Sequence, residues 1–173
     1  MEEKKITSFQ LVYDSFFDRV TSDMYMEQTE YDTLKNIQGI LLNSLHWFKL
    51  PRFDIYDYTL PTKEESAELK AGFFNSVLTA EEINIISVYM MVEWFTQQIA
   101  TTDNTRQIYS GSDFKMTSQA NHVAKLNTLR TQFLEEGKHL QDIYKRRKKG
   151  KDGRLVSSLG QIMETPNHGY KIQ

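Results

Sequence analysis

The sequence has no cysteine and no long hydrophobic run, and both absences restrict what the chain can be. Without cysteine among its 173 residues, disulfide frameworks, zinc ribbons and cysteine nucleophiles are excluded. No apolar stretch approaches the roughly 18 residues that a membrane span needs. The first ten residues, MEEKKITSFQ, open with acidic side chains and hold no apolar region of a secretory signal. We therefore expect a protein that is made and assembled in the cytoplasm, with no membrane contact.

The common catalytic and metal-binding motifs are also missing. The sequence holds no HExxH, GxSxG, P-loop or GxGxxG, and none of its four histidines stands four residues from another. Its acidic pairs, such as Glu64 and Glu65, are adjacent and so do not share a helix face, which makes them poor acid–base pairs. We expect no catalytic residue, no metal and no cofactor, and we predict that the chain is not an enzyme.

What the chain does have is an uneven distribution of charge. Residues 1–144 carry 21 acidic and 13 basic side chains, a net charge of −8, whereas residues 145–173 carry 8 basic and 2 acidic side chains, a net charge of +6. Such a division predicts an acidic body and a cationic tail. The length suits one domain with an arm, and the aromatic fraction of 12% predicts that large aromatic side chains supply much of the core.

Hydrophobic periodicity predicts four helices, over about residues 8–20, 29–48, 80–99 and 118–144. Thr7 or Ser8 can cap the first helix, and a capping box, TAEE, precedes the third. The third helix is apolar on most sides, so we expect it to be central. Gly137 interrupts the fourth at a cost of roughly 1 kcal/mol relative to alanine, which indicates a bend or a close contact. A loop is expected over 103–116.

Between the second and third helices the period changes. Residues 52–60, RFDIYDYTL, are rich in β-forming residues, and a second short apolar run covers about 73–78. We predict a β-hairpin insertion over about 52–78, with a long polar loop that can hold a helical turn. The predicted fold is mainly α: a bundle of about four helices with this small insertion in a domain over 1–147, and an extended C-terminal arm over 148–173.

The arm carries the strongest electrostatic feature of the sequence. Its basic run exceeds what a helix C-terminus needs, and its apolar residues indicate a segment that orders on a partner. The cations can contact DNA phosphates or an acidic protein surface. No aromatic residue is interleaved for base stacking, so any DNA contact is expected to be independent of sequence. The candidate docking residues are Lys145, Arg146, Arg147, Lys148, Lys149, Lys151, Arg154, Leu155, Val156, Leu159 and Ile162.

Four segments of the sequence follow one another in an order that can be compared with known families: LVYDSFFDRVTSDMY, LLNSLHWFKLPRFDIYDY, LTAEEINIISVYMMVEWFTQQI and YSGSDFKMTSQANHVAKLNTLRTQF. Over about residues 6–147 this order resembles the head–tail connector, or neck adaptor, proteins of tailed bacteriophages. The most specific pieces are LTAEEINII, followed by VEW, and SGSDFKMTSQANH. The residues after 149 carry no resemblance.

The resemblance implies a structural virion protein of the neck, which forms a homo-oligomeric, typically dodecameric, ring below the portal protein. The C-terminal segment would dock on the portal, the lower face would receive the stopper or tail-completion protein, and packaged DNA would pass through the ring. An acidic body would keep that DNA from sticking. The hairpin could contact a neighbouring subunit or face the tail side. Its candidate residues are Phe53, Tyr56, Tyr58, Phe73 and Phe74.

One alternative from a different class stays open. The chain could be a small helical protein that binds nucleic acid without sequence specificity, through its basic C-terminal segment. DNA affinity that falls steeply with salt would favour this alternative. The acidic body favours a protein partner for the cations.

Overall fold

The computed structural model describes residues 6–20, 25, 28–108, 116–149 and 155–157, which form a mainly α fold with a small antiparallel sheet. The helices are α1 (Phe9–Phe17), α2 (Glu30–Ser44), α3 (Lys63–Ala67), α4 (Ala80–Ile108) and α5 (Met116–Arg146), with a 3₁₀ turn, η2 (Leu45–Trp47). The strands are β1 (Thr7–Ser8), β2 (Tyr58–Thr59), β3 (Phe73–Phe74), β4 (Arg147–Lys149) and β5 (Leu155–Ser157). The predicted fold class is confirmed.

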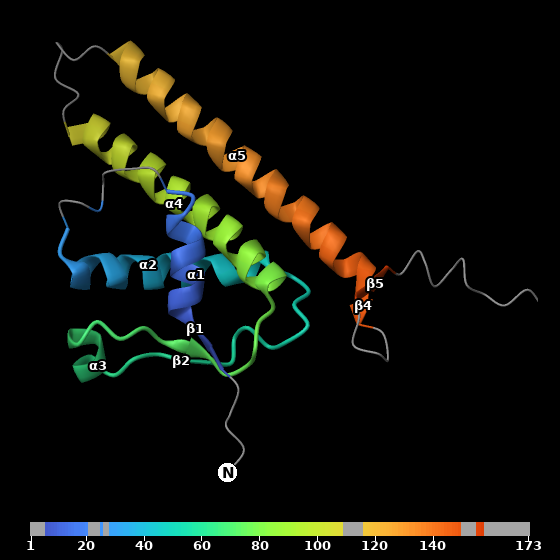
Figure 1. The fold of residues 1–173 in the computed structure, drawn as a ribbon. Coiled ribbons are helices and arrows are strands. Elements are labelled where there is room, and N and C mark those ends of the chain that lie inside the picture. Colours follow the sequence, from blue (N-terminus) through green and yellow to red (C-terminus); the bar gives the residue numbers. More distant parts are fainter. Residues whose placement is uncertain (1–5, 21–24, 26–27, 109–115, 150–154, 158–173) are drawn as a thin grey trace, which may run out of the picture.

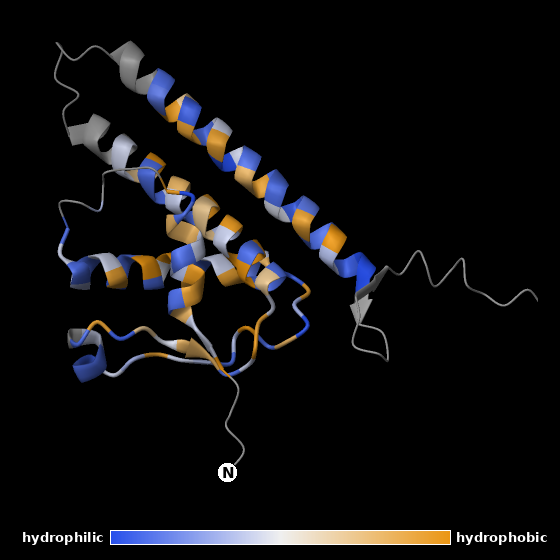
Figure 2. Ribbon diagram, in the orientation of Figure 1, coloured by the Kyte–Doolittle hydropathy of each residue, from blue (hydrophilic) through white to orange (hydrophobic). Residues whose placement is uncertain are grey.

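Helix α4 is the centre of the molecule, as its apolar pattern predicts. Helix α5 runs antiparallel along one side of α4 (Figure 1). Helices α1 and α2 also pack against α4, on other sides of it. Figure 2 shows hydrophobic residues gathered in the first half of α4, whereas α5 alternates between hydrophobic and hydrophilic residues. At 1.5 Å per residue, the 29 residues of α4 span roughly 43 Å. The two long helices therefore set the length of the molecule.

The predicted starts of the first three helices are confirmed by capping hydrogen bonds. The Ser8 hydroxyl accepts the amide of Gln10 at 3.2 Å, and the Thr29 hydroxyl accepts the amide of Asp32 at 3.1 Å. At α4 the Thr79 amide donates to a Glu82 carboxylate oxygen at 2.7 Å, while the Glu82 amide donates to the Thr79 hydroxyl at 3.3 Å. This reciprocal pair is a complete capping box.

The predicted hairpin is present, and it belongs to a sheet that the sequence does not predict. Strands β2 and β3 pair antiparallel, and the loop between them holds the short helix α3. Strand β1 adds to the other edge of β3, with Thr7 opposite Phe74. The Thr7 hydroxyl also accepts the Leu78 amide at 2.8 Å. Thr7 and Ser8 are thus held by residues far along the sequence, and Thr7 belongs to a strand instead of capping α1.

Two predicted boundaries are wrong. The expected loop over 103–116 is helical up to Ile108, and the next helix already begins at Met116. The C-terminal segment is predicted to be an extended arm that orders on a partner. Instead β4 begins directly after α5 and pairs antiparallel with β5, with Lys148 opposite Val156. The basic run therefore changes from helix to strand between Arg146 and Arg147.

Aromatic side chains fill the core, as the composition predicts. Phe9, Tyr13 and Phe16 project from one face of α1 and are almost fully buried. The Phe9 ring meets the Phe74 ring edge-on, with 4.7 Å between centroids. Such an arrangement adds to the free energy of burial. It joins α1 to the sheet.

Gly137 and Gly39 both lie inside helices, and we predict opposite outcomes for their substitution by alanine. A Cβ atom at Gly137 would lie 2.6 Å from Cε1 of the buried Tyr89 ring, whereas a Cβ at Gly39 would meet nothing within 4 Å. Gly137→Ala should lower the free energy of unfolding by about 1–3 kcal/mol through overpacking. Gly39→Ala should raise it by about 0.5–1 kcal/mol through helix propensity. Urea denaturation of both variants measures these changes; a stabilised Gly137→Ala variant would contradict the close contact.

Candidate docking surface

The last turns of α5 are held against the segment that follows α2. The Gln141 side chain accepts the Lys49 amide at 3.0 Å and donates to the Trp47 carbonyl at 2.9 Å, and it also hydrogen-bonds the Tyr89 hydroxyl. The Trp47 indole N–H in turn donates to Glu93 at 2.7 Å. Gln141 is almost fully buried, so these bonds satisfy its amide. They fix the C-terminal end of α5 to the body.

Tyr144 is the centre of a second set of contacts, one turn further along α5. Its hydroxyl accepts the Arg52 amide at 2.9 Å and donates to the buried carboxylate of Glu82. The Arg52 guanidinium lies 4.4 Å from the centroid of the Tyr144 ring, a cation–π contact. Burial, followed by the hydrogen bond to Glu82, raises the pKa of Tyr144 above its ordinary value. The phenol therefore stays protonated and serves as the donor to Glu82.

The cations at the end of α5 fall into two groups. Lys145 lies 3.4 Å from Asp142, and Arg147 donates to Glu81, at the start of α4, at 3.0 Å. The Arg147 carbonyl also accepts the Arg52 guanidinium at 2.9 Å. Arg146 is exposed, as Lys145 and Arg147 are, and over the described residues it makes no ion pair. Because these pairs are themselves partly exposed, they contribute little stability. The contacts of Arg147 nevertheless join the first residue of β4 to Glu81 and Arg52.

The docking residues predicted beyond Arg147 are partly described. Lys148 and Lys149 lie in β4 and face Val156 and Leu155 of β5 in the ladder. The other four predicted residues, Lys151, Arg154, Leu159 and Ile162, lie outside the described residues. The structure thus brings part of the basic run and part of the apolar segment together in one small hairpin.

The hairpin aromatics predicted to face a partner differ in exposure. Phe53 and Tyr56 are 45% and 59% exposed, and Tyr58 and Phe73 are half-buried. Phe74 is fully buried against Phe9, so it belongs to the core and cannot contact a second protein. The physical reason is alternation along the strand, which sends successive side chains to opposite faces of the sheet.

Two residues of this region were missed as surface candidates. Leu50 is 60% exposed, and Arg52 links the loop to β4 through the Arg147 carbonyl. They flank Pro51, which lies shortly after the end of η2, and the sequence offered no signal beyond a leucine and an arginine on either side of a proline. Together with Phe53, Arg146 and Arg147, which are also exposed, they make up what we call the basic–aromatic surface: Leu50, Arg52, Phe53, Arg146 and Arg147.

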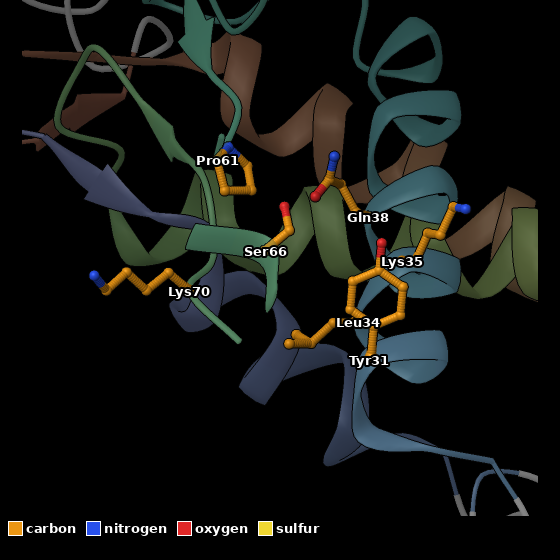
Figure 3. Close-up of a pocket in the computed structure, with 7 residues that line it drawn as sticks. All are labelled: Tyr31, Leu34, Lys35, Gln38, Pro61, Ser66 and Lys70. Carbon is orange, nitrogen blue, oxygen red and sulfur yellow. The ribbon is translucent and has the colours of Figure 1, made fainter. Parts of the chain in front are cut away.

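Neither of two depressions in the described part of the chain gathers catalytic groups. One, of about 170 Å³, lies between α2 and the loop that holds α3, and in Figure 3 the Lys35 and Lys70 amines point away from each other. Another, of about 400 Å³, is a largely apolar groove between α4 and α5. Over the described residues, no three His, Asp or Glu side chains come together to hold a metal ion. Nor does any helix there have the length and apolarity to cross a bilayer.

Comparison with protein-family models, with curated proteins and with solved structures finds no match for this chain.

Removing the Tyr144 hydroxyl tests the junction at the end of α5. In Tyr144→Phe the ring still packs against Phe48, but the buried Glu82 oxygen and the Arg52 amide lose their partner. The free energy of unfolding should fall by about 1–3 kcal/mol. The control Tyr31→Phe, at a 45% exposed tyrosine, should change it by less than about 0.5 kcal/mol. Equal effects in denaturant titrations of the two variants would show that the junction contributes nothing specific.

Proposed function

We propose that this chain is a structural virion protein of a tailed bacteriophage, a head–tail connector subunit in a ring that joins the portal to the stopper or tail. The order of motifs that resembles the neck adaptor family is the origin of this proposal. The observation that carries it is the cationic end of α5. There, Arg146 and the basic strand β4 are presented at a fixed place by the contacts of Arg147 with Glu81 and of Arg52 with Tyr144.

A fixed cationic hairpin supports docking on an acidic protein surface. Preorganisation lowers the entropy that a binding segment loses on association. Opposite charge on the partner accelerates association and fixes its register. The basic–aromatic surface adds Leu50 and Phe53, which are exposed close to Arg52 in the sequence, and exposed apolar side chains suit a protein–protein interface. Phosphate binding alone would need no apolar side chains.

In this proposal the portal is the partner of the C-terminal hairpin, and neighbouring copies of the chain complete the ring. The packaged DNA passes through without sequence-specific contact. The net charge of −8 over residues 1–144 supports that role, because an acidic wall repels the phosphate backbone. The chain has no enzymatic activity in this proposal and takes no cofactor.

Neutralising three cations of the hairpin tests the proposal. The variant Arg146→Gln/Lys148→Gln/Lys149→Gln keeps Arg147, which pairs with Glu81. Its affinity for the portal protein of the same virus, measured by co-sedimentation with portal rings, should fall about tenfold or more. The control Lys35→Gln/Lys63→Gln/Lys125→Gln removes the same charge at exposed positions of α2, α3 and α5 and should bind like the unmodified chain.

The same variants separate the proposal from nucleic-acid binding. Fluorescence anisotropy with a labelled duplex, at low and at moderate salt, should show weak binding that the hairpin variant does not change. Tight binding that weakens steeply with salt, and that only the hairpin variant loses, would support a nucleic-acid-binding protein instead. Unchanged portal binding by the hairpin variant would overturn the assignment of the docking segment.

A further inference from the structure

A groove of about 300 Å³ lies beside the Gln141 contacts, between α5 and the segment after η2. Aromatic side chains, Trp47 and Tyr89, line it, and Lys49, Lys138 and Lys145 stand around it. The Trp47 and Tyr89 rings are nearly parallel, with 6.3 Å between centroids. Among the residues that line the groove the one acid is Asp142, which pairs with Lys145. The lysine-rimmed groove is thus an apolar floor with an excess of positive charge.

The outer face of α1 has the complementary character. Leu11 is 53% exposed, and Asp14 and Asp18, the residue that caps the C-terminal end of α1, are exposed as well. Residues three and seven positions apart lie on the same side of a helix, so one leucine and two carboxylates form a single stripe. Phe17 borders this stripe at 37% exposure. No cation lies within α1 itself, because its sequence is FQLVYDSFF.

We infer that the lysine-rimmed groove binds the outer face of α1 of a second copy of this chain. Leu11 of one copy would enter the groove of the next, and Asp14 and Asp18 would meet the lysines around it. An amphipathic helix that lays its apolar side chain into a groove is a common mode of recognition. The inference rests on the proposed function in one respect: a connector ring needs a contact between neighbouring subunits, and this contact supplies it.

The contact has to join two molecules. Arg19, just after α1, lies 3.8 Å from Glu136 of α5, so the chain's own α1 adjoins that side of α5. Lys138 lies two positions further along α5, and residues two apart on a helix do not face the same way. Figure 1 shows α1 crossing α4, away from the end of α5 and β4. A chain therefore cannot place its own α1 in its own groove.

Charge also selects the geometry of the contact. A two-fold dimer through the grooves would set lysines against lysines, and one through α1 would set carboxylates against carboxylates. Like charges across an interface are repulsive. The favourable contact is heterologous, with the groove of one copy on α1 of the next, and such contacts build rings or open filaments.

Two variants, each damaged on one side of the contact, test the inference. The first, Asp14→Lys/Asp18→Lys, reverses the α1 stripe and keeps the groove. The second, Lys49→Ala/Lys138→Ala, weakens the groove and keeps α1. The control Glu30→Lys/Glu135→Lys makes the same charge change as the first at exposed acids of α2 and α5. Circular dichroism and thermal melting establish that every variant is folded before association is compared.

Sedimentation velocity of the full chain at up to about 1 mM, in low salt, is the measurement, since a contact with a Kd in that range is then half occupied. The unmodified chain and the control should form dimers and larger species that dissociate at high salt, because exposed charges are screened. Each damaged variant alone should associate about tenfold or more weakly. Mixed in equal amounts they should form dimers, because one variant supplies an intact groove and the other an intact α1.

The other outcomes overturn the inference. If the unmodified chain stays monomeric at low salt, the contact does not exist. If one damaged variant still dimerises alone, or if the mixture forms no dimers, the association uses other surfaces. Portal binding is measured separately and leaves the groove lysines in place, so a failure here does not decide the portal proposal. Self-association without portal binding would leave the α1 contact standing and remove the proposed function.

Discussion

One buried carboxylate, that of Glu82, joins the two long helices at the end where the cations are. One oxygen accepts the Thr79 amide and hydroxyl, at 2.7 and 2.9 Å, which caps α4. The other accepts the Tyr144 hydroxyl, which belongs to the end of α5. A carboxylate with no exposed surface is tolerated because it is hydrogen-bonded on both sides and lies at the positive end of the α4 dipole. The start of α4 and the end of α5 are therefore held together through this one carboxylate.

This junction explains why a basic segment can act as a fixed surface. Strand β4 begins at the residue after α5, with no linker between them. Arg147 is held by Glu81, the neighbour of Glu82, and Arg52 is held over the ring of Tyr144. The direction of β4 thus follows from the contacts that keep α4 and α5 together. A segment held in this way loses less conformational entropy when it binds than a free tail would.

Local chemistry was predictable from the sequence, and contacts between distant residues were not. Ser8, Thr79 and Glu82 form caps that the sequence predicts, and the close contact at Gly137, one of the two explanations expected there, is with Tyr89. Strand β1 was missed because two residues carry no recognisable period, and their partner β3 lies far along the chain. Glu82, the hydrogen-bond partner of Tyr144, likewise lies far from it in the sequence.

Helix α4 continues beyond its predicted end for a local reason that the polarity of the sequence does not reveal. The run after Ile99 is polar, which reads as a loop, yet the Thr101 and Thr102 hydroxyls donate to the carbonyls of Gln97 and Gln98 at 2.9 and 2.8 Å. Threonines that bond back to the preceding turn are compatible with a continuing helix.

In the candidate site, the sequence alone located the cluster of cations at the end of α5. The exposure of Leu50 and the burial of Phe74 depend on packing between elements, which the sequence pattern does not contain.

The charges beside the exposed apolar side chains are what indicate contact surfaces. Single exposed leucines are normal on protein surfaces. Leu11, however, lies in a stripe with two carboxylates, and the groove at Trp47 is surrounded by lysines, so the two surfaces differ in sign. Both belong to elements packed on α4, and the Glu82 junction fixes α5 relative to α4. The relative orientation of the α1 stripe and the groove is consequently a property of the folded subunit. In a head-to-tail assembly this orientation sets the rotation from one copy to the next, and that rotation decides whether a ring closes and how many copies it contains.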